Sequence, residues 1–573
     1  MQLGISKSIS KRKKESALIM RKQTKLVAVL STAALLALGA SMSSFAATGW
    51  QEENGTWVYY NKGGELETEK WEKSGDNWFY LNEDGEMTTD AVVEYSDNYY
   101  YVDENGAMAT NKWVSVENTD YDGSSDDEPT NHWYYFGSNG KAYKSSSTSN
   151  NATFKTINGK NYIFDDEGKM LYGWIGTDGE RKTGDDAWTE GDYYCGNEND
   201  GARAEGWVSL DIVDDAYDTN APRLSSKNVF DDENQTRFFY FKGNGKKMRN
   251  EMGKTINGKK YSFDKDGRMN AEWITDTATP TTATASQADA TYTKDWRYYG
   301  TPEDGARVTK GWFKVVPDEN LQQNKYNDDE DAWYYSDKDG KLVASEIKTI
   351  NGKKYAFDQH GRMKDGLLFL SFNGKSTTSI NDILDDDNTD MPYDTEDHFK
   401  ENASKLSAAQ YYCYYFGNGD DGSMKTNKQN VSIDGESFSF LFNKSGSFKG
   451  AGKTGVDSSK YYLSGMLLTA DKEDKYAVVK IDDTNKDAVK YTLLTTDKFL
   501  DETDYVKTDS IPTGKDWAEY YTVNNKAAAE KHITYRLINT AGSVQKNKSK
   551  AKDGNDRCYV QDGQNITSLY VEN

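Results

Sequence analysis

A short phrase recurs three times between Trp50 and Trp113 at a spacing of 21 residues. Each copy contains an aromatic cluster followed by a turn that ends in glycine, at Gly64, Gly85 and Gly106. A unit this short cannot bury an apolar core by itself, so the repeat predicts stacked units that cover one another. An array of this kind favours binding along its length over catalysis.

Five dipeptides predict tight β-hairpins, since Asn-Gly and Asp-Gly accept the positive φ angles of a type I′ turn. They are Asn54-Gly55, Asn158-Gly159, Asn257-Gly258, Asn351-Gly352 and Asp434-Gly435. Glycines of a second turn are expected in the left-handed conformation at Gly85, Gly106, Gly140, Gly168, Gly267 and Gly361. Because a lone hairpin is marginal in water, we predict an all-β fold. Its architecture is expected to be an elongated solenoid of stacked β-hairpin repeats with long acidic loop insertions.

Beyond Trp113 the repeat becomes longer. Trp207 and Trp312 close similar segments 105 residues apart, which indicates a duplicated module of that length. Acidic insertions at Asp211–Asp232 and Asp318–Asp331 are predicted to be loops from their composition. The predicted organisation is hairpin repeats over 47–145, duplicated modules over 146–450 and a degenerate β-rich region over 451–573.

Residues 1–46 predict a secretory signal peptide. Basic residues at Lys11–Lys14 precede an apolar run from Leu26 to Ala40, and small residues lead to Ala46. The run is shorter than the roughly 20 residues that a membrane-spanning helix needs. We therefore expect cleavage and secretion, without a transmembrane anchor.

The charge of the chain argues against one class of partner. It has 93 acidic and 70 basic residues, a formal net charge of −23. Nucleic-acid binding requires a basic footprint, so no nucleic acid is expected as a partner. The acidity either serves solubility or attracts cationic groups.

Cysteine and histidine usage indicates neither a disulfide framework nor a metal site. The three cysteines are Cys195, Cys413 and Cys558, and the first two are predicted to be small strand residues. The four histidines are scattered, and acidic runs such as Asp385–Asp387 lack the pattern of a calcium loop. We expect no metal and no cofactor.

The repeated segments resemble the cell-wall-binding, choline-binding-type repeats of Gram-positive surface proteins. The likeness is carried by GWQEENGTWVYYNKGGEL at Gly49–Leu66, WEKSGDNWFYLNEDGEM at Trp71–Met87 and NGKKYSFDKDGRM at Asn257–Met269. The first two look like the choline-binding type. The third is more similar to the repeats of clostridial toxins and glucan-binding glucosyltransferases. The resemblance covers most of residues 49–450.

The resemblance implies which side chains would bind a ligand. In the choline-binding family, rings of adjacent hairpins enclose the quaternary ammonium of teichoic-acid choline, since a ring face attracts a cation. In the toxin type, a sugar ring stacks in the same groove. The implied ligand-binding residues are Trp50, Trp57, Tyr60, Trp71, Trp78, Tyr80, Met87, Met108, Trp113, Trp174, Trp207 and Trp312. The alternative for each of them is packing of hairpin on hairpin without ligand contact.

These observations predict a secreted, non-catalytic surface protein that binds cell-wall polymer, either choline-substituted teichoic acid or a glycan. No LPxTG-type motif precedes Asn573, so attachment to the wall is expected to be non-covalent. One alternative is a glucan-binding or host-glycan-binding adhesin, or a structural surface protein. A more remote alternative is a wall hydrolase with its catalytic domain in 451–573, where Cys558 and His532 lack the context of a nucleophile. The oligomeric state stays open.

Overall fold

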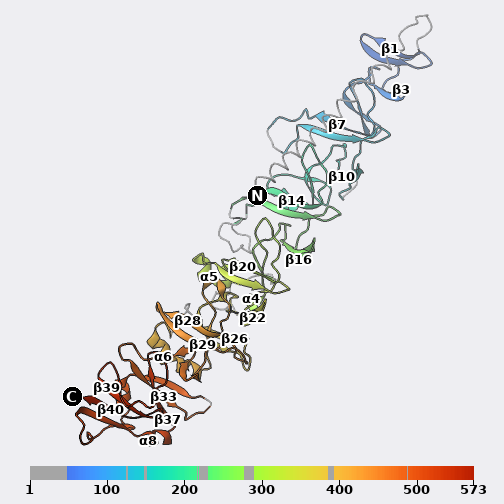
Figure 1. Ribbon diagram of the computed structural model, residues 1–573. Helices are drawn as coiled ribbons and strands as arrows, with labels where there is room; N and C mark the ends of the chain where they lie inside the picture. The colour runs from blue at the N-terminus through green and yellow to red at the C-terminus, as the bar shows by residue number, and fades with distance from the viewer. Residues whose placement is uncertain are drawn as a thin grey trace. The chain divides into compact units, whose positions relative to one another are not determined.

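The computed structural model describes residues 48–573 except 124–126, 147–150, 216, 218–229, 231, 276–289, 385–392 and 487. The predicted signal peptide and the acidic run at Asp385–Asp387 lie outside the described residues. The described chain is mostly β, with short antiparallel strands in small sheets and a few short helices (Figure 1). It divides into two compact units. The first comprises Met1–Asp218, Asp232–Glu251 and Phe263–Met269, and the second comprises Thr219–Asp231, Met252–Ser262 and Asn270–Asn573.

The first unit is a series of antiparallel hairpins. They are β1 (Gly49–Glu53) with β2 (Thr56–Tyr60), β3 (Lys70–Ser74) with β4 (Asn77–Leu81), β5 (Ala91–Tyr95) with β6 (Asn98–Val102), β7 (Lys112–Glu117) with β8 (Asn131–Phe136), β9 (Lys155–Ile157) with β10 (Lys160–Tyr162), β11 (Gly173–Ile175) with β12 (Arg181–Lys182) and β13 (Tyr193–Cys195), and β14 (Gly206–Val213) with β15 (Asn234–Phe241). Helix α3 (Ala187–Glu190) precedes β13. The division between the units falls within the hairpin of β16 (Glu251–Ile256) and β17 (Lys259–Phe263).

The second unit begins with similar small sheets and ends with larger ones. The small sheets are β18 (Trp273–Thr275) with β19 (Trp296–Tyr298), β20 (Gly311–Val315) with β21 (Ala332–Ser336), β22 (Glu346–Ile350) with β23 (Lys353–Phe357) and β24 (Met363–Lys364), and β25 (Leu367–Phe372) between β26 (Ile380–Leu384) and β27 (Tyr412–Tyr415). The larger sheets follow the orders β28 (Asn427–Ile433), β29 (Glu436–Phe442), β32 (Met466–Leu467), β31 (Lys460–Leu463), β30 (Gly455–Asp457); β34 (Lys490–Leu494), β33 (Tyr476–Asp482), β37 (Ile533–Asn539); and β35 (Val506–Thr508), β36 (Trp517–Val523), β40 (Asn565–Glu572), β39 (Arg557–Asp562), β38 (Ala551–Lys552). The helices are α4 (Ala290–Lys294), α5 (Glu319–Asn327), α6 (Glu396–Ala408), α7 (Thr496–Leu500) and α8 (Asn525–Glu530), with a 3₁₀ turn at Gly419–Asp421.

The predicted turns are present. At the first Asn-Gly pair, φ is 51° for Asn54 and 85° for Gly55, and both residues of the other four pairs also have positive φ. The six glycines predicted for the second turn have φ between 77° and 93°. Because these angles suit glycine, asparagine and aspartate, the turn residues set the strand register locally.

One backbone hydrogen bond recurs between successive hairpins. The loop that follows a hairpin donates an N–H to a carbonyl of the hairpin before it, as from Met87 to Trp57 at 2.7 Å. Equivalent bonds in the first unit run from Met108 to Trp78, Ala142 to Tyr99, Met170 to Trp133, Arg203 to Asn161 and Lys247 to Asp192. In the second unit, Met424 donates to Lys354 in the same way. Each of these hairpins therefore relies on its neighbour for a backbone partner as well as for cover.

The glycine and methionine of the repeat make a second contact between neighbours. Met87 lies against Gly106, where an added Cβ would come within 2.8 Å of the methionine sulfur, and Met108 lies against Gly140. Leu66 lies against Gly85 in the same manner. The recurrence of glycine and methionine at these positions thus has a packing reason that does not involve a ligand.

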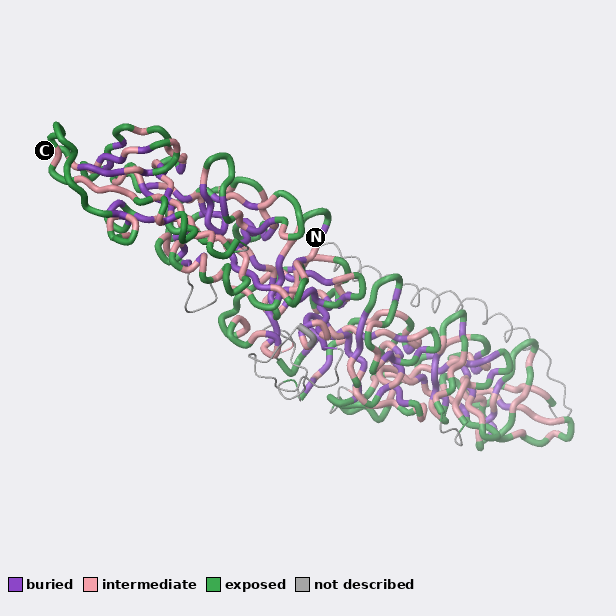
Figure 2. Tube along the Cα trace, turned by 90° about the horizontal axis from the view of Figure 1, so that it is seen from below, coloured by how far each residue is buried: buried purple, intermediate pink, exposed green. Residues whose placement is uncertain are grey.

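Aromatic rings and branched aliphatic side chains form the cores between hairpins. One cluster in the first unit contains Val114, Tyr134 and Phe136, and the next contains Tyr162 and Phe164. In Figure 2 buried residues lie along the strands, while exposed residues concentrate in the turns and loops. The structure therefore has many small cores in place of one large one.

The prediction that the insertion at Asp318–Asp331 is a loop is wrong, because this segment contains helix α5. The Asp318 side chain accepts a hydrogen bond from the backbone N–H of Asn320 at 2.8 Å and caps the helix. Leu321 is 0% exposed and joins a buried aromatic cluster. The prediction relied on the acidic composition of the segment, which indicates neither the helix cap at Asp318 nor the burial of Leu321.

The insertion at Asp211–Asp232 also begins differently from the prediction. Asp211–Val213 extends strand β14, because it pairs with β15. The residues 216, 218–229 and 231 of this insertion lie outside the described residues. The predicted loop is therefore corrected only at its start.

All three cysteines are buried in strands with free thiols. Cys195 lies in β13, Cys413 in β27 and Cys558 in β39. The prediction that the first two are small strand residues is confirmed. A search of the described residues finds no helix with the length and apolarity needed to cross a membrane.

The glycine contact gives a stability prediction. We expect Gly106→Ala to destabilise the first unit more than Gly75→Ala. Both residues have positive φ, which costs about 1–2 kcal/mol for alanine, but only Gly106 faces a neighbouring side chain. Urea unfolding followed by tryptophan fluorescence measures the difference. Equal losses in the two variants would contradict the role given to the Gly106–Met87 contact.

Candidate aromatic binding site

The strand register builds one pair of rings into most hairpins. A tryptophan of the first strand lies opposite a tyrosine of the second, with ring centroids 5.1–5.4 Å apart. These pairs are Trp50–Tyr59, Trp71–Tyr80, Trp113–Tyr135, Trp174–Tyr194, Trp207–Tyr240 and Trp312–Tyr335. Each of these hairpins thus has an aromatic face, and the neighbouring hairpin adds further rings to it.

One such face is completed into a three-ring pocket in the first unit. Trp113 of β7, Trp133 of β8 and Tyr162 of β10 line it together with Met170, and its volume is about 20 Å³. The Trp113 and Tyr162 ring centroids are 4.8 Å apart at an interplanar angle of 64°. Tyr162 and Met170 are each 8% exposed and form the base, while the two tryptophans are half-buried. Asp200 adds a carboxylate to the lining.

The second unit repeats this constellation at Trp312. Its ring centroid lies 4.8 Å from Tyr355 at 69° and 6.3 Å from Trp333 at 88°. Met363 packs in the same cluster, in the position that Met170 has in the first pocket. The contact of Trp312 with Tyr355 matches that of Trp113 with Tyr162 in distance and angle, so these two ring pairs repeat one arrangement.

A carboxylate accompanies each set. Asp420 accepts a hydrogen bond from Trp333 Nε1 at 2.8 Å and lies 3.4 Å from Lys314 Nζ. The hydrogen bonds from Trp333 and Lys314 lower the pKa of Asp420, so this carboxyl is ionised at neutral pH. Ring faces and a carboxylate together favour a cation.

The two sets of rings differ at the second tryptophan. Trp133 Nε1 is buried and has no hydrogen-bond partner among the described residues, whereas Trp333 Nε1 is bound to Asp420. Asp200 in turn lies 3.6 Å from Lys160 Nζ, both side chains being exposed. No polar contact therefore restrains the Trp133 ring.

The two N-terminal hairpins carry similar sets of rings. Trp50 contacts Phe79 at 5.4 Å, and Trp71 contacts Tyr100 at 5.1 Å. Trp78 is 41% exposed. Trp57 and Trp78 accept the inter-hairpin hydrogen bonds from Met87 and Met108 through their carbonyls, which places each methionine backbone beside a tryptophan.

Tyr60 stands apart from the other residues expected to bind ligand. It pairs with Gly49, one position beyond the Trp50–Tyr59 pair, so its ring lies on the opposite face of the hairpin. Its hydroxyl donates to Glu53 Oε1 at 3.1 Å. Tyr59 occupies the ring position on the cage face.

The face at Trp174 is already filled by the protein. Lys247 Nζ lies 5.0 Å from the Trp174 ring centroid and 5.8 Å from that of Phe239, and it donates to the carbonyl of Trp188. Lys247 is 3% exposed. Burial, aided by the positive charge of Arg249, lowers the pKa of Lys247 to about 7. In its own repeat, Lys247 occupies the position that Met170 occupies beside the Trp113 pocket. At Trp174, therefore, a lysine amine of the chain itself lies against the aromatic face.

Trp207 makes the same stacking contact as Trp113 and Trp312. It stacks on Phe263 at 5.7 Å and 30°, as Trp113 stacks on Phe164 at 5.8 Å and 26°.

One face of the series is closed by packing. In the second unit, Trp273 and Trp296 are 0% and 1% exposed and pack with Leu321 from helix α5. The tryptophans at equivalent positions of successive hairpins therefore range from lining a pocket, as at Trp113, to complete burial, as at Trp273.

Six residues of the two sets of rings were not among those predicted from the sequence. They are Trp133, Tyr162, Met170, Trp333, Tyr355 and Met363. A signal was present: HWYYF and AWYYS repeat the spacing of TWVYY, and NGKNY and NGKKY supply the tyrosines. Combining the aromatics of successive hairpins would have identified them.

Family comparisons agree with this arrangement. Residues 67–113 match the model of the choline-binding repeat, and residues 130–142 match that of a putative cell wall binding repeat. Glucosyltransferase-S of Streptococcus mutans is 25% identical over 235 residues, which span 41% of this chain and 11% of that protein.

Three solved structures from Streptococcus pneumoniae are similar to parts of the chain. The modular autolysin LytC is 19% identical, covers 58% of this chain and is itself covered over 57%, with a TM-score of 0.28. Choline binding protein F is 16% identical with 70% and 98% coverage and a TM-score of 0.25. The choline binding domain of Spr1274 is 30% identical over 17% of this chain and 95% of its own, with a TM-score of 0.13.

The buried amine gives a pH prediction. The unfolded chain keeps the Lys247 proton up to a pH of about 10, whereas the folded protein releases it near 7. The unfolded state therefore binds more protons between these values, and this residue makes the free energy of unfolding rise from pH 7 to pH 9. We expect Lys247→Met to reduce that rise, as measured by urea unfolding at both pH values. The exposed neighbour Lys246→Met is the control, and an unchanged rise in Lys247→Met would contradict the burial of a charged amine.

Proposed function

We propose that this chain, which carries repeats of the choline-binding and cell-wall-binding family, binds choline-substituted polymer of a Gram-positive cell wall in cages between neighbouring hairpins. The observation that supports this most strongly is the three-ring pocket of Trp113, Trp133 and Tyr162, whose ring contact is repeated by Trp312 and Tyr355. A quaternary ammonium has no N–H to donate, so it is best stabilised by ring faces, and each desolvated contact is worth about 2 kcal/mol.

The pocket must widen to admit this group. Its volume of about 20 Å³ suffices for a single water molecule and is smaller than a trimethylammonium group. The Trp133 ring is half-buried, and its Nε1 gives up no hydrogen bond when it turns outward. We therefore expect Trp133 to move on binding, with Asp200 balancing the charge of the ligand.

The proposal extends to the whole protein. The chain is secreted, is not itself an enzyme and stays on the wall non-covalently, with several weak sites adding through multivalency. The hairpins stack as a solenoid, and the segments 47–145, 146–450 and 451–573 act as successive parts of it. The rings around Trp50 and Trp71, beside the exposed Trp78, add weaker sites. The face at Trp174 serves as scaffold, because Lys247 already fills it.

A glycan ligand is the second candidate. It is favoured by the match to Glucosyltransferase-S and by the exposed ring of Trp78, whose face suits a sugar. Retention of the purified chain on glucan, but not on choline-agarose, would select this candidate. Release of fragments from purified walls would instead reveal a hydrolase.

The proposal predicts that two substitutions each weaken choline binding at a different site. We expect Trp133→Ala and Trp333→Ala each to remove one choline site, because each deletes one wall of a cage. Loss of about 2 kcal/mol corresponds to roughly 30-fold weaker binding at that site. Tryptophan fluorescence titration with choline measures this.

Trp517→Ala is the matched control, since Trp517 lies in strand β36 and stacks on Tyr570 away from both cages. We expect it to leave choline binding unchanged. Choline affinities of Trp133→Ala and Trp333→Ala equal to that of the unsubstituted chain would contradict the assignment of the two cages.

A further inference from the structure

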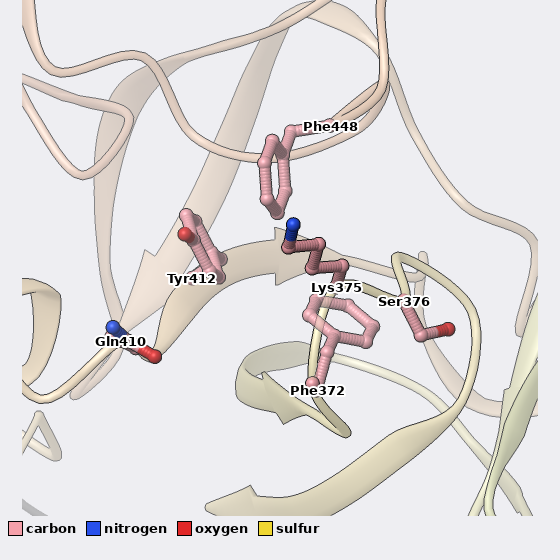
Figure 3. A pocket seen from close by; sticks show the side chains of 7 residues that line it. Phe372, Lys375, Ser376, Gln410, Tyr412 and Phe448 are labelled. Atoms are coloured by element: carbon pink, nitrogen blue, oxygen red, sulfur yellow. The ribbon is translucent and has the colours of Figure 1, made fainter.

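A different kind of pocket lies in the second unit, around the sheet of β25, β26 and β27. It has a volume of about 70 Å³ and is lined by Phe372, Lys375, Gln410, Tyr412 and Phe448, together with Gly374 and Ser376. Figure 3 shows the three rings around the opening, with the Lys375 side chain extending between them and its amine ending beside Phe448. The site belongs to no pair of hairpins that forms a cation cage.

The aromatic walls are well defined. Tyr412 stacks on Phe448 with centroids 4.3 Å apart at 24°, and Phe372 lies 6.1 Å from Tyr412 and 6.4 Å from Phe448. All three side chains are half-buried, so part of each ring meets solvent. Ring surfaces of this kind bind the C–H face of a ligand ring through burial of apolar area.

The charge at this pocket is opposite to that at the cation cages. Lys375 is exposed and has no ion-pair partner among the described residues, although the chain as a whole carries a net charge of −23. The loop that supplies Phe448 also contains Lys444 and Lys449, both exposed. An ammonium group among the rings disfavours a second cation and favours an anion.

Polar groups at the rim add hydrogen-bonding capacity. Gln410 has an exposed amide, which can both donate and accept. Ser376 serves the fold, because its hydroxyl accepts the backbone N–H groups of Thr378 and Ser379 and points away from the rings in Figure 3. The lining therefore combines apolar walls, one cation and one amide.

We infer that this pocket binds one sugar ring that bears an anionic substituent, a carboxylate or a phosphate. The ring stacks against Tyr412 and Phe448, the substituent pairs with Lys375, and a hydroxyl group bonds Gln410. A volume of about 70 Å³ accepts the edge of one ring, so the ligand is a single residue of a longer polymer. This site is independent of the cages, and it would give the protein a second contact with an acidic glycan.

The test compares three soluble probes on the purified full chain. They are a galacturonic acid trimer, a neutral galactose trimer and galactose 6-phosphate, each titrated by calorimetry at low and at high salt. The variant is Lys375→Gln, with Lys472→Gln as the control because Lys472 is an exposed lysine of the same unit outside the pocket.

We expect one or both acidic probes to bind more tightly than the neutral trimer. Lys375→Gln should weaken the acidic probe about fivefold or more and remove most of its salt dependence, because a charge-assisted hydrogen bond is lost. Its affinity for the neutral trimer should not change. The two acidic probes distinguish a carboxylate from a phosphate.

A second variant, Phe448→Ser, removes a wall of the pocket from a loop position. We expect it to weaken all sugar probes while choline binding at the proposed cages, which share no residue with this pocket, stays unchanged and shows that the chain is folded. Failure of every sugar probe to bind, equal binding of acidic and neutral probes, or no effect of Lys375→Gln would each overturn the inference. If the unsubstituted chain does not bind choline at all, that result would count against the proposed function and not against this inference.

Discussion

The structure depends on one constraint: a two-stranded hairpin of this size cannot bury its own aromatic rings or provide partners for all of its backbone groups. Its rings have a partner across the strands, as in Trp113–Tyr135, but the outer side of that pair needs a neighbour. The neighbour supplies a backbone N–H, as from Met170 to Trp133, and a ring such as Tyr162. Every open or closed site described above is a variant of this contact.

The same contact explains why some aromatic faces are filled by the protein and another forms a pocket. The side chain that a neighbouring segment supplies makes the difference. Lys247 fills the face at Trp174, and Leu321 from a helical insertion fills the face at Trp273. At Trp113 the corresponding loop residue is Met170, which lines the pocket, and at Trp312 it is Met363. A repeat can therefore change from ligand site to scaffold through one substitution or one insertion.

Local features of this fold could be predicted from the sequence, whereas contacts between hairpins could not. The turn at Asn54-Gly55 and the alternation of aromatic residues are set by neighbouring residues in the chain, and both are present. The strand register, which places Tyr59 opposite Trp50 and Tyr60 on the other face of the hairpin, is set by the pairing and not by the residue types alone. The roles of Lys247 and Leu321 depend on burial between distant segments, which composition does not reveal. Trp133 and Tyr162 come together only when two hairpins are considered jointly.

The central claim is that choline occupies the open cages and avoids the filled ones. A crystal structure of the full chain soaked with choline tests it most directly. The account predicts density for a quaternary ammonium among Trp113, Trp133 and Tyr162 and at the copy around Trp312, with none at Trp174 beside Lys247. Density at Trp174 with Lys247 displaced, or empty cages at both Trp113 and Trp312, would contradict it.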